Sequence, residues 1–311
     1  MAQLVLRTAI GTYGHTRALK DGSTTSPHFE MEHIEVSPVT SIFRRMVRGL
    51  EFDVAEMALS TYLCARAHGK PFTALPIFLT RAFYHGAIVY HTRSGIKSPT
   101  DLTGRRVGVR GYTVTPGVWT RGLLQREYGL DLSSVTWILS GDEHVAEYVP
   151  PPNVISSPNS DLVAMLVSGE IDAAIGIGAV KTPDIQPLFP EAGAADAAWF
   201  KRTGVYPISH MLVVKNDQLA KNPWLAEELF TLFKSAKRPY IAALHAGAAA
   251  SAADQALLAM SRLVGDDPIP YGFEAARQTL ETFVGFNVDQ GVIPQWVDPK
   301  EVFAPTTIGL S

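Results

Sequence analysis

Short apolar runs of strand length alternate with segments of helical periodicity along most of the chain. In the segment 41–48, Ile42, Phe43, Met46 and Val47 recur at the spacing that places them on one face of a helix. Strands are expected at 4–9, 52–58, 86–91, 106–110 and 171–177, and further helices from about 61, at 116–128 and at 160–167. This alternation predicts an α/β fold in which helices flank each sheet.

Two segments repeat one pattern. "MVRGLEFDVAEMALS" and "LVSGEIDAAIGIGAV" each combine a helix end, a glycine, an acidic residue and a buried strand that ends in small residues. The repeat predicts two lobes with a ligand cleft between them, beyond the carboxyl ends of the strands. We expect residues 1–86 and 210–311 to form lobe one and residues 87–209 to form an inserted lobe two. The chain would cross between the lobes near Gly86 and His210, and these two crossover strands would form the hinge.

The C-terminal third has a mainly helical pattern. Its Ala-rich stretch 242–260 predicts one long helix. Such a helix packs either on its own chain or on a second copy, so the sequence leaves a homo-oligomer open.

Composition narrows the class of partner. Charged residues make up 18% of the chain and the formal net charge is −3. A nucleic-acid partner is not expected, because such proteins usually carry a basic face. No membrane partner is expected either, because no apolar run reaches the roughly 18–20 residues of a membrane span. The single cysteine, Cys64, excludes an internal disulfide and, with an N-terminus that lacks a secretory pattern, favours the cytoplasm.

The loop 110–115 joins an apolar strand to an amphipathic helix and is rich in hydrogen-bond donors. Thr115 suits the N-cap of that helix, with proline at the first helical position. The free N–H groups of a helix N-terminus favour an anion, and the hydroxyls of Tyr112, Thr113 and Thr115 add donors. Arg110 would add a planar fork for a carboxylate. The alternative is that Thr115 only caps the helix and Arg110 is solvated.

Glu56 interrupts an otherwise apolar strand, which ends just before Ser60. A buried carboxylate must be paired or have a raised pKa. Glu56 is therefore either a positioned acid, or an orienter for a base, or one half of an ion pair in the core. Ser60 is a candidate N-cap for the helix that follows.

Arg81 and His85 stand four residues apart, where the chain is expected to leave lobe one. An arginine can hold a carboxylate while a nearby histidine gives or takes a proton, because its ordinary pKa is about 6.5. His210 lies at the return crossover and is a second candidate for this role. The alternative is a surface ion pair for Arg81 and a backbone hydrogen bond for His85.

Motifs for metals and cofactors are lacking in the sequence. It contains no HxH, HxxxH or HExxH pattern, no GxGxxG or GxxxxGK[ST] loop and no GxSxG elbow. We therefore expect no nucleotide cofactor, no serine-hydrolase chemistry and no metal, although a metal site assembled from distant residues stays open.

Six segments, taken in order, resemble the 4,5-dihydroxyphthalate decarboxylase family, a branch of the type II periplasmic-binding-protein fold. They are "YGHTRALKDG", "RGLEFDVAEMALSTYL", "TRAFYHGAIVY", "DLTGRRVGVRGYTVTPGVWTRGLLQREYGL", "YPISHMLVV" and "DDPIPYGFEAARQTLETFVGFNVDQGV". The resemblance implies a two-lobed fold with a sheet in each lobe. The positions that match the family pattern are Arg17, Glu56, Ser60, Arg81, His85, Tyr112, Thr115, Trp119, Arg121 and His210. The positions that depart from it are Thr12, Gly14, His15, Tyr84 and Gly111, so the ring substituents of the substrate stay open.

The resemblance also implies an activity, which is the cofactor-independent decarboxylation of a dihydroxylated aromatic dicarboxylate. The expected reaction converts 4,5-dihydroxyphthalate to protocatechuate by protonation of the ring and loss of carbon dioxide. His85 or His210 would donate the proton. The substrate would be contacted by the loop 110–115 and by Arg17, Ser60, Arg81 and Trp119. Two alternatives stay open: a protein that binds a small aromatic or carboxylate anion without catalysis, and another cytosolic lyase of the same fold.

Overall fold

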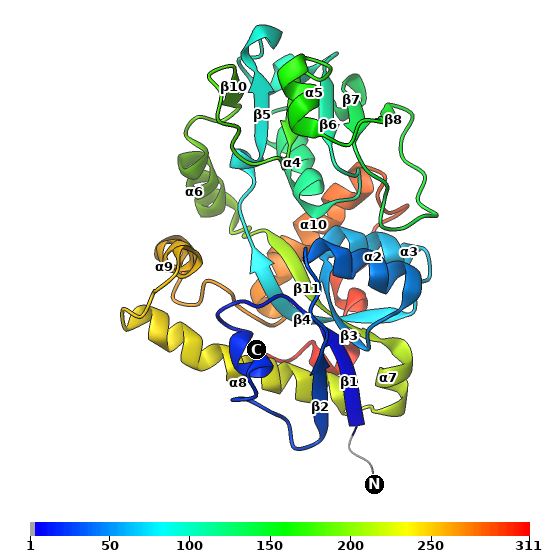
Figure 1. Cartoon of the computed structure of the whole chain (residues 1–311), viewed down its shortest axis with the longest axis vertical. Coiled ribbons are helices and arrows are strands. Elements are labelled where there is room, and N and C mark those ends of the chain that lie inside the picture. Colours follow the sequence, from blue (N-terminus) through cyan, green and yellow to red (C-terminus); the bar gives the residue numbers. More distant parts are fainter. Residues whose placement is uncertain (1–3) are drawn as a thin grey trace.

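The structure is a computed structural model that describes residues 4–311. A five-stranded sheet has the strand order β2-β1-β3-β11-β4 (Figure 1). Strand β1 pairs in parallel with β2 and β3, and β11 runs antiparallel to both β3 and β4. These strands span Leu4–Ala9 (β1), Phe29–His33 (β2), Val54–Ala58 (β3), Phe72–Arg81 (β4) and Ile208–Lys215 (β11).

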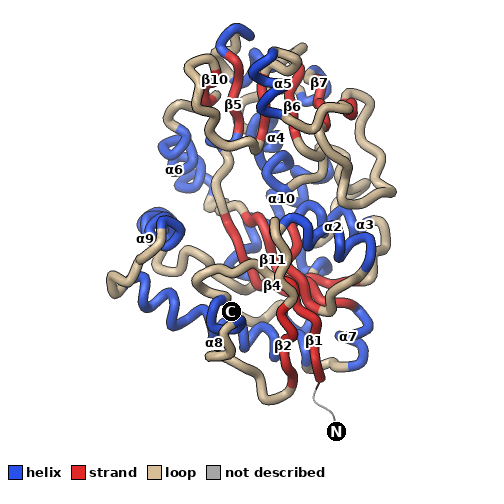
Figure 2. The backbone as a smooth tube through the Cα atoms, viewed as in Figure 1, coloured by secondary structure: helices blue, strands red, loops and turns tan. Residues whose placement is uncertain are grey.

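A second, six-stranded sheet has the order β10-β5-β9-β6-β7-β8. Strands β6 to β9 run parallel, and β5 pairs antiparallel with β9 and β10. Figure 2 shows the two sheets as separate groups of strands, with the chain passing between them after β4 and before β11. The strands span Ile88–His91 (β5), Arg106–Val109 (β6), Thr136–Leu139 (β7), Val154–Ser156 (β8), Ala173–Ile175 (β9) and Ile185–Pro187 (β10). The predicted α/β class with two sheets is confirmed.

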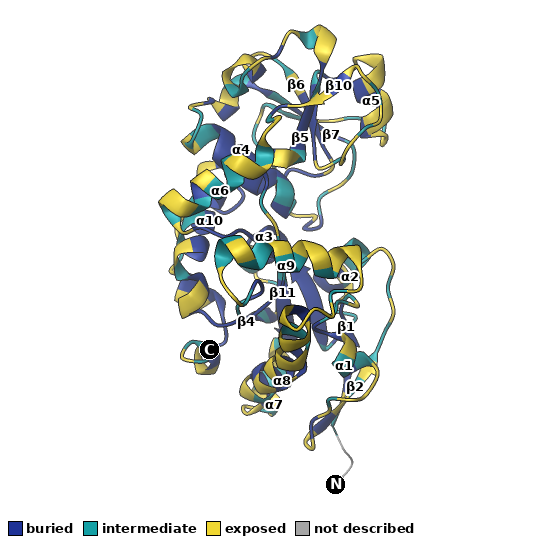
Figure 3. Cartoon of the chain, turned by 90° about the vertical axis from the view of Figure 1, so that its left-hand side faces the viewer, coloured by how far each residue is buried: buried dark blue, intermediate teal, exposed yellow. Residues whose placement is uncertain are grey.

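Helices cover both faces of the first sheet. Helix α8 packs on the face that carries Val54 and Leu212, and α2 packs on the face that carries Ala55 and Met57. In Figure 3 the central strands β4 and β11 are largely buried, whereas the outer surfaces of the surrounding helices are exposed. The helices are α1 (Arg17–Lys20), α2 (Thr40–Gly49), α3 (Leu59–Ala67), α4 (Thr115–Arg126), α5 (Leu162–Ser168), α6 (Ala192–Thr203), α7 (Asn216–Lys221), α8 (Leu225–His245), α9 (Ala252–Val264) and α10 (Arg277–Asp289). Within residues 4–311, none of them combines the length and the apolar character needed to cross a bilayer.

The Ala-rich stretch 242–260 is divided between two helices, so the prediction of one continuous helix is wrong. Gly247 has a φ of 91° just after α8 ends, a conformation that stops an α-helix. Ser251 then starts α9 with a capping box, in which its hydroxyl accepts from the Asp254 amide and the Asp254 carboxylate accepts from the Ser251 amide. The turn and the new cap override the helix propensity of alanine.

Helix α10 connects the two predicted lobes, because it packs on α4. The rings of Trp119 and Phe283 stack with centroids 4.4 Å apart, and Gly122 lies directly beneath the ring of Phe286. A helix in the range expected for lobe one thus packs on a helix in the range expected for lobe two. The predicted lobe boundaries stay a prediction.

Strand directions place the chemistry at one edge of each sheet. Because β11 runs antiparallel to β3 and β4, its first residues lie beside the ends of those strands and near the end of β1. In the second sheet, β6, β7 and β9 end at one common edge. Ligands of open α/β sheets bind beyond such edges, so the loops that follow these strands are the places to examine.

Candidate active site at the facing edges of the two sheets

A buried carboxylate holds one histidine at the edge of the first sheet. The Glu56 side chain on β3 is fully buried, and its Oε1 lies 2.6 Å from Nδ1 of His210 on β11. The same oxygen accepts a hydrogen bond from the Tyr13 hydroxyl at 2.6 Å, and Oε2 accepts from the Gly11 amide at 2.7 Å. Three donors from two other segments therefore converge on one carboxylate.

The surroundings keep Glu56 ionised. Burial by itself raises the pKa of this carboxyl, but the hydrogen bond and charge of His210, with the bonds from Tyr13 and Gly11, lower its pKa below the ordinary value. Burial and the nearby Glu56 carboxylate raise the pKa of Tyr13, so its hydroxyl stays protonated as a donor. Glu56 thus accepts a hydrogen bond that holds the His210 ring, a contact that fits both the orienter and the ion-pair alternative predicted for it.

The His210 ring has one nitrogen held and one nitrogen available. Its side chain retains 18% exposure, and no described residue forms a hydrogen bond with Nε2. The ring of Phe43 contacts it edge-on with centroids 4.8 Å apart, which supports it from α2. A histidine with Nδ1 on a carboxylate and Nε2 toward solvent is arranged for proton transfer.

A cavity of about 230 Å³ adjoins this network. Tyr13 lines it, and so does Thr80, whose backbone pairs directly with His210 across β4 and β11. The register of β11 against β4 shifts on both sides of His210, an irregularity that re-aims side chains and occurs next to active sites. Cross-strand partners lie about 5 Å apart at Cα, so the backbone of His210 is next to the cavity wall, although His210 is not among the described residues that line the cavity.

Two arginines line the cavity. The guanidinium of Arg81 is buried and hydrogen-bonded, whereas Arg17 is exposed. The guanidinium of Arg81 is buried, donates to the carbonyls of Tyr206 at 2.8 Å and Pro270 at 3.4 Å, and lies over the rings of Tyr206 and Phe78. Burial lowers the pKa of Arg81 to about 10, which still leaves it charged near neutral pH. Arg17 is exposed at the cavity, and its side chain has no hydrogen bond or ion pair within residues 4–311. Arg17 is therefore the guanidinium with its whole fork free for a carboxylate.

The loop 110–115 binds an anion, but the anion belongs to this chain. The Glu143 carboxylate accepts from the backbone N–H of Tyr112, and from the N–H and hydroxyl of Thr113 at 3.0 and 2.5 Å. Arg48 of α2 donates to the Glu143 carbonyl at 2.7 Å and to Asp142 at 2.8 Å, so the segment with Glu143 is fixed to α2. The chemistry predicted for the loop is present, and an internal carboxylate uses it.

Neither predicted helix cap forms. Thr115 is the first residue of α4, after Val114 at the N-cap, and its hydroxyl bonds to Ser60 instead. Ser60 lies within α3, where its hydroxyl donates to the Thr113 carbonyl at 2.5 Å and its amide donates to Thr115 at 3.1 Å. Both residues are fully buried, so their hydroxyls join α3 to the start of α4.

Arg110 lines a separate, open hollow of about 560 Å³ beyond the ends of β6, β7 and β9. Arg44 of α2 faces the same hollow but is paired with Asp142 at 2.6 Å. Arg110 is exposed, and its side chain has no ion pair within residues 4–311. It remains available to an anion that enters between the lobes.

His85 lies in different surroundings from His210. Its Nδ1 is 2.5 Å from the Asp196 carboxylate of α6, and its ring packs edge-on against Tyr128, Phe189 and Trp199. The side chain is 2% exposed. Within residues 4–311, no hydrogen bond or ring contact connects His85 to Glu56, to His210 or to the loop 110–115. The structure therefore brings together Glu56 and His210, but not His85.

Trp119 also lies away from the cavity. Its indole N–H donates to the Ile208 carbonyl at 2.9 Å, and its side chain is fully buried. It anchors the start of β11, two residues before His210.

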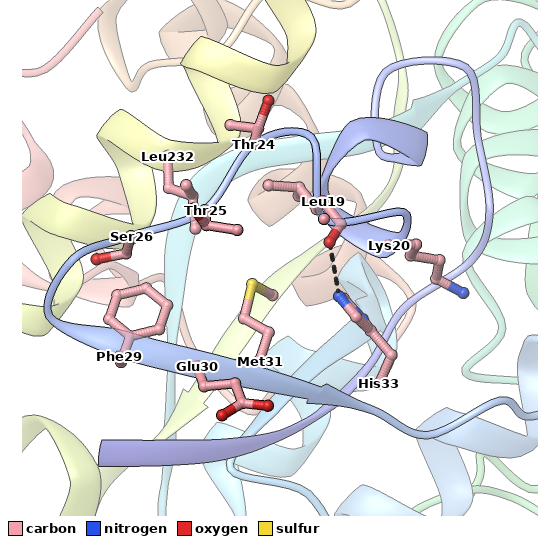
Figure 4. Close-up of a pocket in the computed structure, with 11 residues that line it drawn as sticks. Leu19, Lys20, Thr24, Thr25, Ser26, Phe29, Glu30, Met31, His33 and Leu232 are labelled. Carbon is pink, nitrogen blue, oxygen red and sulfur yellow. Dashed lines mark hydrogen bonds between the residues drawn. The ribbon is translucent and has the colours of Figure 1, made fainter. Parts of the chain in front are cut away.

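Another hollow, of about 450 Å³, lies between the edge strand β2 and the loop after α1 (Figure 4). It is larger than the cavity beside Tyr13. His33 in its wall bonds to the Leu19 carbonyl at 3.1 Å. Lys20 is the one cation among the described lining residues, and it is paired with Glu35 at 2.8 Å. This hollow therefore provides less free positive charge for an anion than the cavity beside Tyr13, which Arg17 lines.

Comparison with known proteins identifies the family. The chain is 30% identical to 4,5-dihydroxyphthalate decarboxylase of Comamonas testosteroni over 330 aligned positions, which cover 99% of this chain and 98% of that protein. The chain belongs to the 4,5-dihydroxyphthalate decarboxylase family. A protein of the same name from Pseudomonas putida is 34% identical over 219 positions, covering 65% of this chain and 83% of that one. Residues 44–149 also match the NMT1/THI5-like family.

Solved structures confirm the predicted periplasmic-binding-protein type of fold for this family member. The aliphatic sulphonate binding protein SsuA of Escherichia coli matches with a TM-score of 0.55 and 15% identity, over 97% of this chain and 92% of that one. The desulfurization enzyme DSZB matches with a TM-score of 0.53 and 16% identity, over 97% and 96%. At these identities the likeness concerns the fold alone.

Sequence reasoning missed several residues that contact the candidate side chains. His15 was noticed only as a departure from the family pattern, whereas Tyr13, Thr80, Glu143 and Asp196 carried no signal of their own. Each acts through a contact with a distant part of the chain, such as Thr80 beside His210. Across residues 4–311, no group of three or more His, Cys, Asp or Glu side chains is arranged to hold a metal ion.

Proposed function

We propose that this protein is a non-oxidative carboxy-lyase that converts 4,5-dihydroxyphthalate to protocatechuate and carbon dioxide. The relatives that carry this name support the reaction class. One structural observation supports the site: His210 bonds through Nδ1 to the buried Glu56 carboxylate and stands beside a cavity that contains two arginines. The relatives' names also favour a cytoplasmic location.

His210 is the proton donor in this proposal. Its Nε2–H gives a proton to the ring carbon that bears the departing carboxylate, and the electron pair of the C–C bond then returns to the ring as carbon dioxide leaves. A hydroxyl para to that carbon stabilises the cationic character of the protonated ring. Proton transfer of this kind contributes typically ~10²–10⁴-fold to a rate. No electrons are gained or lost overall, so the step requires no redox cofactor.

Glu56 is the positioning residue in this scheme. Its carboxylate accepts from Nδ1, which selects the ring orientation and stabilises the imidazolium before the proton leaves. Tyr13 and Gly11 keep the carboxylate in place through their own hydrogen bonds. The pair therefore gives the proposed donor a fixed orientation in partly buried surroundings.

Arg17 holds the carboxylate that the substrate retains. Its guanidinium is free, and a planar fork binds a carboxylate through two parallel hydrogen bonds. Arg81 lies deeper in the same cavity and adds positive charge, although two carbonyls already occupy its terminal nitrogens. The positive charge of the two arginines orients the ring before the proton is transferred.

The test is turnover by the purified full-length protein. Incubation with 4,5-dihydroxyphthalate should release carbon dioxide and protocatechuate in equal amounts, measured by gas analysis and chromatography. The variant His210→Gln should lose turnover, whereas His28→Gln, which lies before β2 and contacts Trp224, should keep it. Saturable binding of the substrate without release of carbon dioxide would overturn the enzymatic proposal and leave a binding protein.

A further inference from the structure

Three residues that line the cavity beside Tyr13 carry buried polar atoms that have no partner among the described residues. Both ring nitrogens of His15, the hydroxyl of Thr80 and Nε of Arg81 are buried and form no hydrogen bond with the described residues. An unpaired buried polar group costs about 1–3 kcal/mol, and native proteins retain few of them. Three such side chains around one cavity indicate that a ligand supplies the missing partners.

His15 is held rigidly in a neutral form. Its ring stacks on Tyr13 with an interplanar angle of 5° and centroids 5.4 Å apart, and its side chain is 2% exposed. The backbone of Leu79 approaches the ring without forming a hydrogen bond of ordinary geometry. Burial, followed by the charge of Lys237, lowers the pKa of His15 to about 4. The imidazole is therefore neutral near pH 7 and offers one donor and one acceptor.

The unpaired atoms match hydroxyl groups better than a carboxylate. A carboxylate accepts only, so it would leave the acceptor nitrogen of His15 unpaired. A hydroxyl group both donates and accepts, as do the Thr80 hydroxyl and the two nitrogens of His15 taken together. Nε of Arg81 adds one more donor to the same wall. Two adjacent ring hydroxyls would therefore satisfy these groups together.

We propose that His15, Thr80 and Nε of Arg81 form a subsite for the ring hydroxyls of the substrate and so select dihydroxylated over unsubstituted aromatic acids. This inference rests on the proposed function, because it assumes that the aromatic acid occupies this cavity. Thr80 pairs across the strands with His210, so the hydroxyl subsite lies next to the proposed proton donor. Arg17 at the cavity is left for the carboxylate.

The experiment compares ligands with and without hydroxyls. Calorimetric titration of the full-length protein would use two ligands. Protocatechuate carries two ring hydroxyls, and phthalate carries none. The substitution Thr80→Val keeps the shape of the side chain and removes the hydroxyl, and it should weaken protocatechuate binding by roughly tenfold or more. Phthalate binding should stay within about twofold. His15→Phe should have the same differential effect, which provides a second variant if one fails to fold.

Thr120→Val is the matched control. The Thr120 hydroxyl is also buried and unpaired, but it lies on α4 and does not line the cavity. This variant should leave the affinity for both ligands unchanged. Equal weakening of the two ligands by Thr80→Val, or no weakening of either, would overturn the subsite.

The subsite and the reaction fail in different ways. If Thr80→Val and His15→Phe lose only protocatechuate affinity while the wild-type protein releases no carbon dioxide, the subsite stands and the proposed reaction falls. If the wild-type protein releases carbon dioxide and both variants bind and turn over like it, the reaction stands and the subsite falls.

Discussion

The Glu143 carboxylate is seated on Thr113, whose backbone N–H and hydroxyl both donate to Oε2, at 3.0 and 2.5 Å. Tyr112 donates its N–H to the other oxygen. These are the groups that the sequence assigns to an external anion. The loop thus has the anion-binding geometry expected of it, and the substrate would have to displace an internal carboxylate to use it.

Replacing Glu143 tests this relationship. Glu143→Ala should lower the free energy of unfolding by about 1–3 kcal/mol, because the N–H groups of Tyr112 and Thr113 lose a charged acceptor. Added sulfate should then raise the melting temperature of the variant more than that of the wild-type protein, because the vacated donors can bind it. Glu147→Ala is the control, since Glu147 pairs with Lys70 on the surface of the same segment. Equal responses to sulfate in all three proteins would contradict the prediction.

The pair of His210 and Glu56 predicts a kinetic signature. His210→Gln should reduce kcat by about 10²–10⁴-fold and leave KM nearly unchanged, because the donor acts in the transition state. Glu56→Gln should also reduce kcat, since the neutral amide no longer stabilises the imidazolium. Steady-state measurement of carbon dioxide release gives both constants. A rise in KM at constant kcat in either variant would show a binding role instead.

His85 should behave differently from His210. Because its Nδ1 is bound to Asp196 among aromatic rings, Asp196→Asn should lower the free energy of unfolding by about 1–3 kcal/mol. The kcat of the folded variant should stay within about twofold of the wild-type value. Urea unfolding and carbon dioxide release would be measured on the same preparation. A kcat that collapses without loss of stability would restore His85 as a candidate donor.

Part of the site follows from local sequence patterns. Glu56 stands out because a carboxylate in an apolar strand needs a partner, and His210 stands out because it begins the return strand. Their contact is then set by β3 pairing with β11, where Ala58 lies opposite His210. The pattern of strands and helices is similarly local, which is why the fold class could be predicted.

The rest of the site depends on contacts between distant segments. Glu143 follows Thr113 by thirty residues, and no spacing rule connects them. Thr80 resembles any threonine of a buried strand until β11 places His210 opposite it. The predicted helix caps do not form for a related reason. The hydroxyls of Ser60 and Thr115 bond to one another instead of accepting from the N–H groups at the helix ends. Tertiary hydrogen bonds decide these roles, and a single sequence does not display them.

Packing between α4 and α10 gives a prediction about stability. A Cβ added at Gly122 would overlap the ring of Phe286, so Gly122→Ala should lower the free energy of unfolding by about 1–3 kcal/mol. Gly193 lies in α6 with nothing within 4 Å of its added Cβ. Gly193→Ala should therefore be neutral or up to about 1 kcal/mol stabilising, because alanine favours the helix. Chemical denaturation of both variants checks the contrast, and equal effects would contradict the packing described.

The buried His15 predicts how stability depends on pH. Burial, with the charge of Lys237, lowers its pKa to about 4 in the folded protein, whereas an unfolded histidine has a pKa of about 6.5. Between these values the unfolded chain binds a proton that the folded protein does not, so the free energy of unfolding falls as the pH falls. From pH 7 to pH 5, the wild-type protein should lose about 2 kcal/mol more than His15→Phe.

Other titrating groups do not obscure this comparison. His144, whose pKa burial also lowers to about 4, is present in both proteins, so its contribution cancels. The pKa of Glu56 is lowered in the folded protein, so its carboxylate stabilises the fold above the ordinary carboxyl range. That contribution is lost only as the pH falls through the pKa of the folded state, which lies below the window from pH 7 to pH 5. Urea titrations at pH 7 and pH 5 on the two proteins give the difference. Parallel pH dependence in both would mean that His15 is protonated in the folded state, and the neutral imidazole required by the hydroxyl subsite would then be absent.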